Sequence, residues 1–169
     1  SLLITSHVAP AGNYNVNITK SLSKKFRKSI SHNKSENLNK RYWISRQNAA
    51  MRKIVNFDEI KPLIEEFNFE IINLEDYSLE TQIKMLNNSE VVAGLQGAGL
   101  TNIFFMNQNT KLLEIRDEND NHNNCYFSLS SALDINFYYC KSNTIEPNNF
   151  HSSDYIVDPN ELKKVFLEM

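Results

Sequence analysis

Three of the four glycines in this 169-residue sequence lie within six residues, at Gly94, Gly97 and Gly99. The stretch GLQGAGLTN ends one apolar run and opens another, which is the order expected of a strand that turns into a helix. In such a turn the backbone N–H groups point at an anion, and the helix dipole favours negative charge. The stretch matches neither G-x-G-x-x-G nor a P-loop, because no Lys-Ser/Thr pair follows it. A tight turn that only lets the helix pack closely on the strand is the alternative interpretation.

Two arginines could face this glycine-rich loop. Arg46 comes directly after an apolar run, and Arg52 follows six residues later. A guanidinium group offers a fork of N–H donors that fits two phosphate oxygens at once. Two arginines near a loop are usually solvated surface charges. Opposite a glycine-rich loop, however, they would form a clamp for a diphosphate.

Glu114 is an acid inside the apolar run LLEI at 112–115. A carboxylate in a protein interior is costly unless it is paired or used. Glu114 therefore either lies at an exposed strand end or contacts a ribose or a base. The acid-rich sequence DEND at 117–120 has the density of a metal-binding loop. We expect an exposed turn there instead, and we predict no metal site.

Five short apolar runs provide the scaffold that these residues need. The runs are bounded by Asn, Gly or charged residues and are apolar at consecutive positions, as strands buried on both faces of a parallel sheet are. They are YWI at 42–44, FEII at 69–72, VVAGL at 91–95, LLEI at 112–115 and INFYY at 135–139. Segments of helical period lie between and after them.

The helical segments fit a regular alternation with these strands. One covers 79–86 behind Ser78 as N-cap, one covers 127–133, and one covers 159–169 behind Asp158 as N-cap. Leu79 and Phe127 are each expected on the buried face of their helix. We predict an α/β fold with a doubly wound, mainly parallel, five-stranded Rossmann-like sheet. Such sheets bind ligands at the carboxyl ends of their strands, where the glycine-rich loop and Arg46 fall.

The net charge of −2 hides a segregation of charge along the chain. From Lys20 to Lys53 there are eleven Lys or Arg residues and one acid, Glu36. Within this stretch Leu22, Phe26 and Ile30 are expected to form one stripe of a basic helix, followed by the polar linker SHNKSENLNK. We therefore divide the chain into an appendage or linker at 1–37 and a ligand-binding domain at 38–169. The basic stretch could meet phosphates, an anionic membrane or nucleic acid, or it could be a solvated helix face.

Composition excludes several classes of protein. Hydrophobic residues make up 41% and charged residues 22%, an ordinary globular balance. No apolar run approaches the length of a membrane-spanning helix. Nucleic-acid binding is disfavoured, because the pI is near 6.1 and the basic stretch contains no recognition motif. The two cysteines cannot form a disulfide scaffold or a four-ligand zinc site by themselves.

Several segments resemble the C-terminal half of family 61 glycosyltransferases, a family that includes bacterial capsular polysaccharide enzymes and plant xylosyl- and arabinosyltransferases. The resemblance runs from about Arg41 to the C-terminus. It is carried by RYWISRQNAAMRKIVN, SLETQIKML, EVVAGLQGAGLTNIFFM, KLLEI and DYIVDPNEL. The segment from Gly97 to Asn102 is the most specific, because it combines sequence, spacing and a strand–loop–helix setting.

The resemblance implies one half of a GT-B architecture, with the nucleotide-sugar donor bound by this domain and the sugar transferred with inversion. It implies that Arg46 and Arg52 hold the donor diphosphate and that Glu114 contacts the nucleoside. The loop that would cradle phosphate or sugar consists of Gln96, Gly97, Ala98, Gly99, Leu100, Thr101 and Asn102. No metal or other cofactor is implied, and UDP is the nucleotide expected from the family. No catalytic residue can be assigned.

Two positions depart from the family pattern. Gln96 stands where the family typically has His, and it can donate a hydrogen bond but cannot carry a proton or a charge. Phe57 stands where an acid is favoured after Asn56. Both departures leave open a catalytically silent nucleotide-binding or assembly subunit as the alternative to an active donor domain. A regulator that binds a small anion is a third possibility.

The function expected from the sequence is therefore transfer of a sugar to a glycan acceptor, in bacterial capsular or surface polysaccharide synthesis. The acceptor domain would be supplied by a missing N-terminal part or by a partner subunit, so the isolated chain is expected to be inactive. We expect a cytoplasmic location. If the basic helix at 19–31 makes a peripheral membrane contact, the protein would lie at the inner face of the membrane.

Overall fold

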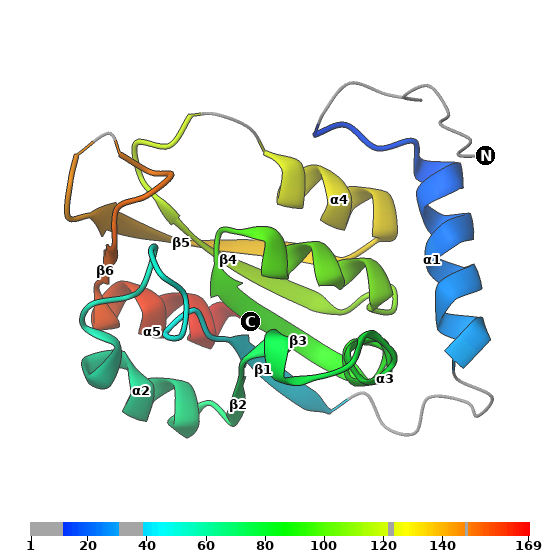
Figure 1. The fold of residues 1–169 in the computed structure, drawn as a ribbon, viewed down its shortest axis with the longest axis horizontal. Coiled ribbons are helices and arrows are strands. Elements are labelled where there is room, and N and C mark those ends of the chain that lie inside the picture. Colours follow the sequence, from blue (N-terminus) through cyan, green and yellow to red (C-terminus); the bar gives the residue numbers. More distant parts are fainter. Residues whose placement is uncertain (1–11, 31–38, 122–123, 148) are drawn as a thin grey trace.

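The computed structural model describes residues 12–30, 39–121, 124–147 and 149–169. The predicted linker falls largely at 31–38, outside the described residues. A six-stranded sheet forms the centre of the molecule and carries helices on both faces (Figure 1). The strands are β1 (Lys40–Ile44), β2 (Phe69–Ile72), β3 (Ser89–Leu95), β4 (Lys111–Asp117), β5 (Asn136–Thr144) and β6 (Tyr155–Val157).

The helices alternate with the strands along most of the chain. The α-helices are α1 (Val16–Ile30), α2 (Phe57–Glu66), α3 (Leu79–Asn87), α4 (Cys125–Leu133) and α5 (Pro159–Glu168). Two 3-10 helices are η1 (Leu74–Asp76) and η2 (Ala98–Phe105). The stretch after the glycine-rich loop is therefore helical, in the tighter 3-10 form. Among the described residues, no helix combines the length and the hydropathy that a bilayer crossing requires.

The strand order is β2-β1-β3-β4-β5-β6, and the first five strands are parallel. All five strands predicted from the apolar runs are present, and the mainly parallel α/β architecture is confirmed. The predicted number of strands was one too few. The sixth strand, β6, pairs antiparallel with the end of β5. It has only three residues, with Ile156 exposed between two buried neighbours, which is too short a pattern to separate from a loop.

The sheet divides the core into two clusters, one on each face. Trp43 of β1 packs with α2 and α5, whereas its neighbours Tyr42 and Ile44 pack with α3, η2 and α4. The same alternation continues in β3, where Val91 and Val92 belong to opposite clusters. Strands buried on both faces in this way read as continuous apolar runs. The alternation also puts a side chain at position 114 on the face that carries α3, η2 and α4.

The predicted helix starts are confirmed more fully than the predicted buried faces. The Ser78 hydroxyl accepts from the N–H of Thr81, and Asp158 accepts from the N–H of Asn160. Leu79 and Phe127, however, are exposed rather than buried. Leu79 is the first residue of α3, and Phe127 makes an edge contact with Phe137 of β5 while remaining half exposed. The apolar stripe expected on α1 also differs, because Thr19 and Ser23 face inward while Leu22 is exposed.

Candidate functional site

The candidate site lies where β1 and β3 end side by side at the carboxyl edge of the sheet. The connection from β1 leads through α2 to β2 on one side, and the chain then returns through α3 to β3 on the other. This reversal is the switch point at which open α/β sheets bind their ligands. Ile44 and Gly94 are paired in register, so the loops after the two strands meet. Arg46 lies in the first loop and Gln96 in the second.

The Arg46 side chain is held in place by the loop that follows it. Its Nε donates to the carbonyl of Arg52 at 3.2 Å, and its Nη2 donates to the carbonyl of Met51 at 3.4 Å. The remaining nitrogen, Nη1, is the one closest to Gly97. Because backbone carbonyls already orient this guanidinium, a ligand would not have to order it.

Arg52 approaches the same place from the far end of that loop. Its guanidinium donates to the carbonyl of Gln96, and its Nε is buried without a hydrogen-bond partner among the described residues. The backbone of Arg52 has a φ of 61°, in the left-handed region that few residues other than glycine adopt. Such conformations cost about 1–3 kcal/mol and cluster at ligand sites. The bond from Arg46 to the Arg52 carbonyl helps to hold this conformation.

Gly97 makes room for both guanidinium groups. A Cβ atom built on Gly97 would lie 2.6 Å from Nη2 of Arg52 and 3.0 Å from Nη1 of Arg46. Its φ of 161° and ψ of 173° are extended values that other residues also adopt. A larger side chain at this position would therefore displace the two guanidinium groups rather than strain the backbone.

The site is strongly positive for its degree of burial. Burial lowers the pKa of the Arg46 guanidinium, and the nearby charge of Arg52 lowers that pKa further. Glu75 acts in the opposite direction on the same pKa. A cavity of about 130 Å³ lies beside Arg46 and is also lined by Ser45, Glu75 and Gly99. Two converging guanidinium groups next to a small cavity form a site for an anion.

The glycine-rich loop turns sharply into η2. The N–H of Leu100 donates to the carbonyl of Gly97 at 2.9 Å, and the Leu100 side chain is buried in the core. The Asn102 amide donates to the carbonyl of Gly99 at 3.1 Å. A Cβ on Gly99 would lie 3.1 Å from a methyl group of Ile44, so this glycine lets the loop pack on β1. Leu100, Gly99 and Asn102 thus build the turn that presents Gly97.

Glu114 connects this loop to a second, larger cavity. Its side chain is only 1% exposed and forms a hydrogen bond with the side chain of Gln96. Burial raises the pKa of the Glu114 carboxyl to about 7, although Arg116 lowers that pKa and Asp120 raises it. The Oε1 atom of Glu114 is buried and has no hydrogen-bond partner among the described residues. A buried carboxyl with an open acceptor position is suited to a ligand hydroxyl.

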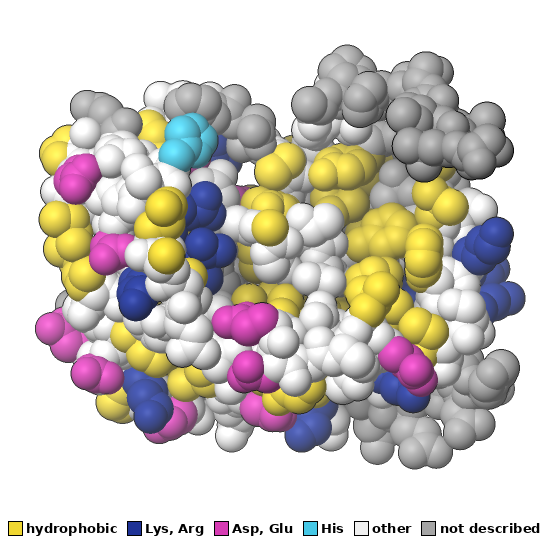
Figure 2. All heavy atoms as spheres, in the orientation of Figure 1, with side chains coloured by type: hydrophobic (Ala, Val, Ile, Leu, Met, Phe, Trp, Pro, Cys, Tyr) yellow, Lys and Arg dark blue, Asp and Glu magenta, His cyan; other side chains and the backbone are white. Residues whose placement is uncertain are grey.

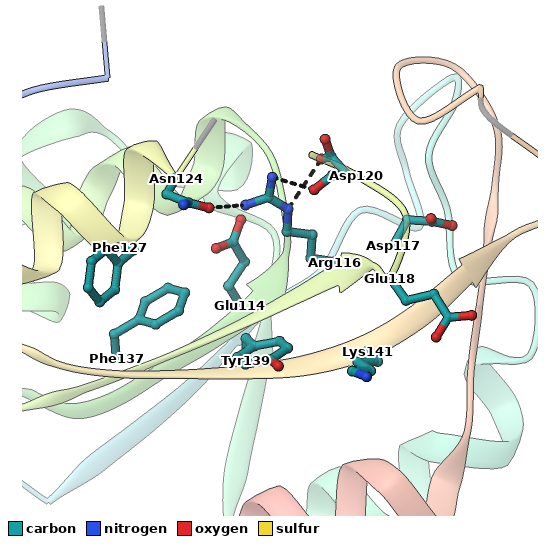
Figure 3. A pocket seen from close by; sticks show the side chains of 10 residues that line it. All are labelled: Glu114, Arg116, Asp117, Glu118, Asp120, Asn124, Phe127, Phe137, Tyr139 and Lys141. Carbon is teal, nitrogen blue, oxygen red and sulfur yellow. Dashed lines mark hydrogen bonds and ion pairs between the residues drawn. The ribbon is translucent and has the colours of Figure 1, made fainter. Parts of the chain in front are cut away.

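The larger cavity has a volume of about 490 Å³ and lies over the carboxyl ends of β4 and β5 (Figure 3). Glu114 projects into it from β4, toward Asn124 at the start of α4 (Figure 3). Phe137 and Tyr139 of β5 and Phe127 of α4 add aromatic rings. This combination of aromatic surface and a few polar groups is typical of a site for a small organic ligand.

Hydrogen bonds hold the Arg116 side chain in place at the rim of this cavity. It donates to the Asn124 side chain at 2.9 Å and to the Asp120 carbonyl at 2.7 Å (Figure 3). The acid-rich turn at 117–120 is less exposed than expected, because Asp117 and Asp120 are buried. The Asp117 carboxylate accepts from the N–H groups of Asn119 and Thr144. Among the described residues, no group of three or more His, Cys, Asp and Glu side chains could hold a metal ion.

Comparison with known proteins decides the family. The sequence model described as Glycosyltransferase 61 matches residues 1–113, about two thirds of the chain. The chain belongs to glycosyltransferase family 61. The match starts ahead of Arg41, where we expected the resemblance to begin, and it ends before the closing DYIVDPNEL segment.

Two rice proteins are similar to part of this family 61 chain. Alpha-1,3-arabinosyltransferase XAT2 of Oryza sativa subsp. japonica is 36% identical over 76 residues, which is 43% of this chain and 12% of that protein. Alpha-1,3-arabinosyltransferase XAT3 of the same organism is 34% identical over 68 residues, 38% of this chain and 12% of that protein. The aligned segment is thus a small part of each relative.

The family 61 chain brings together most of the residues singled out in its sequence. Arg46, Arg52 and Gly97 meet at the switch point, and Glu114 joins them through Gln96. Ala98 and Thr101 are exposed on the first turns of η2. Their roles toward a donor stay predictions. Phe57, which replaces an expected acid, packs against the core cluster of α2 and α5.

Sequence reasoning on the family 61 chain missed two residues of the site. The Tyr126 hydroxyl donates to the carbonyl of Gly97 at 2.6 Å, and Arg116 lines the larger cavity. The sequence could have indicated Arg116, because it lies two residues after Glu114 and side chains two residues apart point to the same face of a strand. Nothing in the sequence indicated Tyr126, because its hydrogen bond joins residues 29 apart.

We predict that Tyr126→Phe lowers the free energy of unfolding of this family 61 chain by about 1 kcal/mol, since it removes a buried hydrogen bond. It should also weaken anion binding a few-fold, because the Gly97 carbonyl loses the hydrogen bond that holds it in position. Thermal unfolding and calorimetric titration measure the two effects. Ser89→Ala is the matched control, because its buried hydroxyl also donates to a backbone carbonyl, that of Leu86, but at the amino end of β3. Equal losses of anion affinity in both variants would contradict a specific role for Tyr126.

Proposed function

We propose that this chain carries the donor site of an inverting glycosyltransferase that moves a sugar from a nucleotide-sugar to a glycan acceptor. The observation that supports this most is the convergence of Arg46 and Arg52 on Gly97 at the switch point of the sheet. Both guanidinium groups are oriented by backbone carbonyls before any ligand arrives. Membership of family 61 supports the reaction class.

The chemistry of inverting transfer matches what this site offers. The acceptor hydroxyl oxygen forms a bond to the anomeric carbon while the bond from that carbon to the diphosphate oxygen breaks. The hydroxyl proton passes to a general base, and negative charge develops on the departing diphosphate. Arg46 and Arg52 would stabilise this charge through charge-assisted hydrogen bonds, and the start of η2 adds its dipole. We assign the base to the acceptor side of the complete enzyme rather than to a residue of this chain.

We place the nucleoside of the donor in the 490 Å³ cavity. Ribose hydroxyls can donate to the Glu114 carboxyl, which lies between Gln96 and Arg116. The rings of Phe137 and Tyr139 offer a surface on which a base can stack. The hydrogen bond that the Gln96 amide donates to Glu114 would couple nucleoside binding to the loop that holds the diphosphate. A UDP-linked donor is the proposal for the nucleotide.

The acceptor is proposed to be a surface glycan, as in bacterial capsule synthesis, and the two rice relatives are named as arabinosyltransferases. In a GT-B enzyme a second domain would supply the acceptor site. Without that domain or a partner subunit, we expect this chain to bind the donor and to turn over little. A cytoplasmic location, with α1 as a peripheral contact at the inner membrane face, belongs to the same proposal.

A catalytically silent nucleotide-binding subunit is the second candidate. The observation that favours it is Gln96, which stands where the family typically has His and which directs its side chain to Glu114. This candidate predicts the same nucleotide binding as the first. It differs in that no partner domain would restore sugar transfer.

Calorimetric titration with UDP, GDP, CMP and UDP-sugars tests the donor site. We expect one nucleotide to bind saturably and Arg46→Ala to weaken that binding about tenfold or more, since it removes charge-assisted hydrogen bonds. Lys61→Ala is the control, because Lys61 is an exposed cation on α2 that forms an ion pair with Glu65 and does not line the site. An equal loss in both variants, or no binding by folded protein, would refute the proposed site.

A further inference from the structure

Helix α1 presents an unusual face to the body of the molecule. It packs across α3, η2 and α4, but the residues that it buries are Thr19 and Ser23. Ile18 and Leu22 stay exposed, and Phe26 lies edge-on to two phenylalanines of η2 while remaining half exposed. Figure 2 shows hydrophobic side chains gathered between α4 and α1, with basic side chains along the outer side of α1. The helix contains five basic residues and no acid.

A cavity of about 220 Å³ opens between α1 and the body. Its lining residues on α1 are Lys20, Ser23, Lys24 and Arg27, which recur at the spacing of one helix face. The other walls are Met106, Gln108, Leu133 and Asp134. These wall residues precede β4 and β5, so the cavity lies at the amino edge of the sheet, opposite the edge that carries Arg46.

The charges in this cavity are only partly balanced. Lys20 pairs with Asp134 at 2.6 Å, whereas Arg27 donates to the neutral side chain of Asn107. The Nε of Arg27 is buried without a hydrogen-bond partner among the described residues. Burial lowers the pKa of the Arg27 guanidinium. Three cations thus share one carboxylate among the residues that line this cavity.

We propose that this cavity is a second anion site, which binds a phosphate monoester or diester group. Arg27 and Lys24 would contact the phosphate oxygens, and Lys20 would remain bridged to Asp134. The cavity of about 220 Å³ has room for a phosphate group. The site is independent of the proposed glycosyl transfer, because it shares no residue with the donor site.

The phosphate could belong to a lipid headgroup or to a soluble molecule. A bilayer would also contact the exposed Ile18 and Leu22 and the outward Lys25 and Lys28 of the same helix. Basic amphipathic helices bind anionic membranes through this combination of apolar area and charge. A soluble phosphate would not need the apolar side chains. Replacing Leu22 by a polar residue should therefore weaken binding to a bilayer but not binding of a soluble phosphate.

The test follows backbone amide chemical shifts of the full chain by NMR during titration with inorganic phosphate and with glycerol phosphate. Amides of residues 20–27 and 106–108 report this cavity, and those of 97–102 report the donor loop separately. We expect saturable shifts at the cavity that Arg27→Gln weakens about tenfold. Lys25→Gln is the matched control, because it removes the same charge from α1 at a residue that does not line the cavity. Lys24→Gln repeats the test with an exposed lining residue if Arg27→Gln does not fold.

Vesicles of phosphatidylglycerol and phosphatidylcholine in equal parts, compared with pure phosphatidylcholine, identify the source of the phosphate. Binding to the anionic vesicles that falls in Leu22→Ser, and that falls clearly further in Arg27→Gln than in Lys25→Gln, supports a lipid headgroup. Binding of glycerol phosphate that is unchanged by Leu22→Ser, without vesicle binding, supports a soluble ligand. Equal weakening by Arg27→Gln and Lys25→Gln, or no shifts at residues 20–27 with any probe, would overturn the site.

Discussion

Gly97→Val is expected to reduce nucleotide affinity more than a hundredfold while leaving the fold intact. A Cβ at this position would come within 2.6 Å of Arg52 and 3.0 Å of Arg46, at the far ends of flexible side chains. The valine methyl groups would displace both guanidinium groups, each of which is worth about 1.5–3 kcal/mol in a charged hydrogen bond. The extended backbone at Gly97 accepts valine without strain. Calorimetric titration and far-UV circular dichroism measure affinity and fold.

A comparison of variants separates loss of the two arginines from general damage to the loop. Gly97→Val should match the double variant Arg46→Ala/Arg52→Ala rather than either single variant. Added to that double variant, Gly97→Val should cause no further loss, since the groups that it displaces are already gone. If Gly97→Val binds nucleotide normally, the guanidinium groups are not positioned for the ligand as described.

Glu114→Gln is expected to stabilise the protein above neutral pH by about 3 kcal/mol, because each pKa unit corresponds to about 1.4 kcal/mol. Burial raises the pKa of Glu114 from 4.5 to about 7, so the folded state holds this proton where the unfolded state has released it. Stability therefore falls as pH rises from about 4.5 to about 7. Glutamine has no charge to desolvate and keeps an acceptor oxygen.

Urea denaturation of the wild type and Glu114→Gln at about pH 5 and about pH 8 checks this prediction. The two proteins should be similar at the lower pH and should diverge at the higher pH, with the wild type less stable. Glu118→Gln is the control, because Glu118 lies at the rim of the same cavity with an exposed side chain. Parallel pH profiles for wild type and Glu114→Gln would show that Glu114 is not held in a desolvated position.

The strands and the switch point were predictable because each depends on local sequence. Buried parallel strands are apolar at consecutive positions, and the loops after them carry Arg46 and the glycines. Leu79 and Phe127 were placed wrongly because helical period specifies a face but not how far the neighbouring layer extends over it. The β6 strand is stabilised by pairing with a distant strand rather than by its own three residues.

The geometry of the site could be predicted only in part. Glu114 stood out because an acid interrupts an apolar run, but its raised pKa depends on burial, which outweighs the opposing effects of Arg116 and Gln96. The convergence of Arg46 and Arg52 requires the positive φ at Arg52. An arginine in the sequence does not predict this backbone conformation. Tyr126 reaches Gly97 only through the packing of α4 on η2. Tertiary packing, rather than local sequence, determines each of these contacts.

The polar inner face of α1 has a consequence for local opening of the molecule. Burial of Thr19 and Ser23 releases little apolar surface from water. Apart from the edge contacts of Phe26, α1 is attached by side-chain bonds such as Ser23 to the Phe104 carbonyl and Lys20 to Asp134. Segments held in this way separate at a fraction of the free energy needed to unfold a sheet. Amide hydrogens of α1 would exchange well before those of β3 and β4. An anion bound by both Arg27 and the neighbouring loop would slow that exchange and would fasten the helix to the domain.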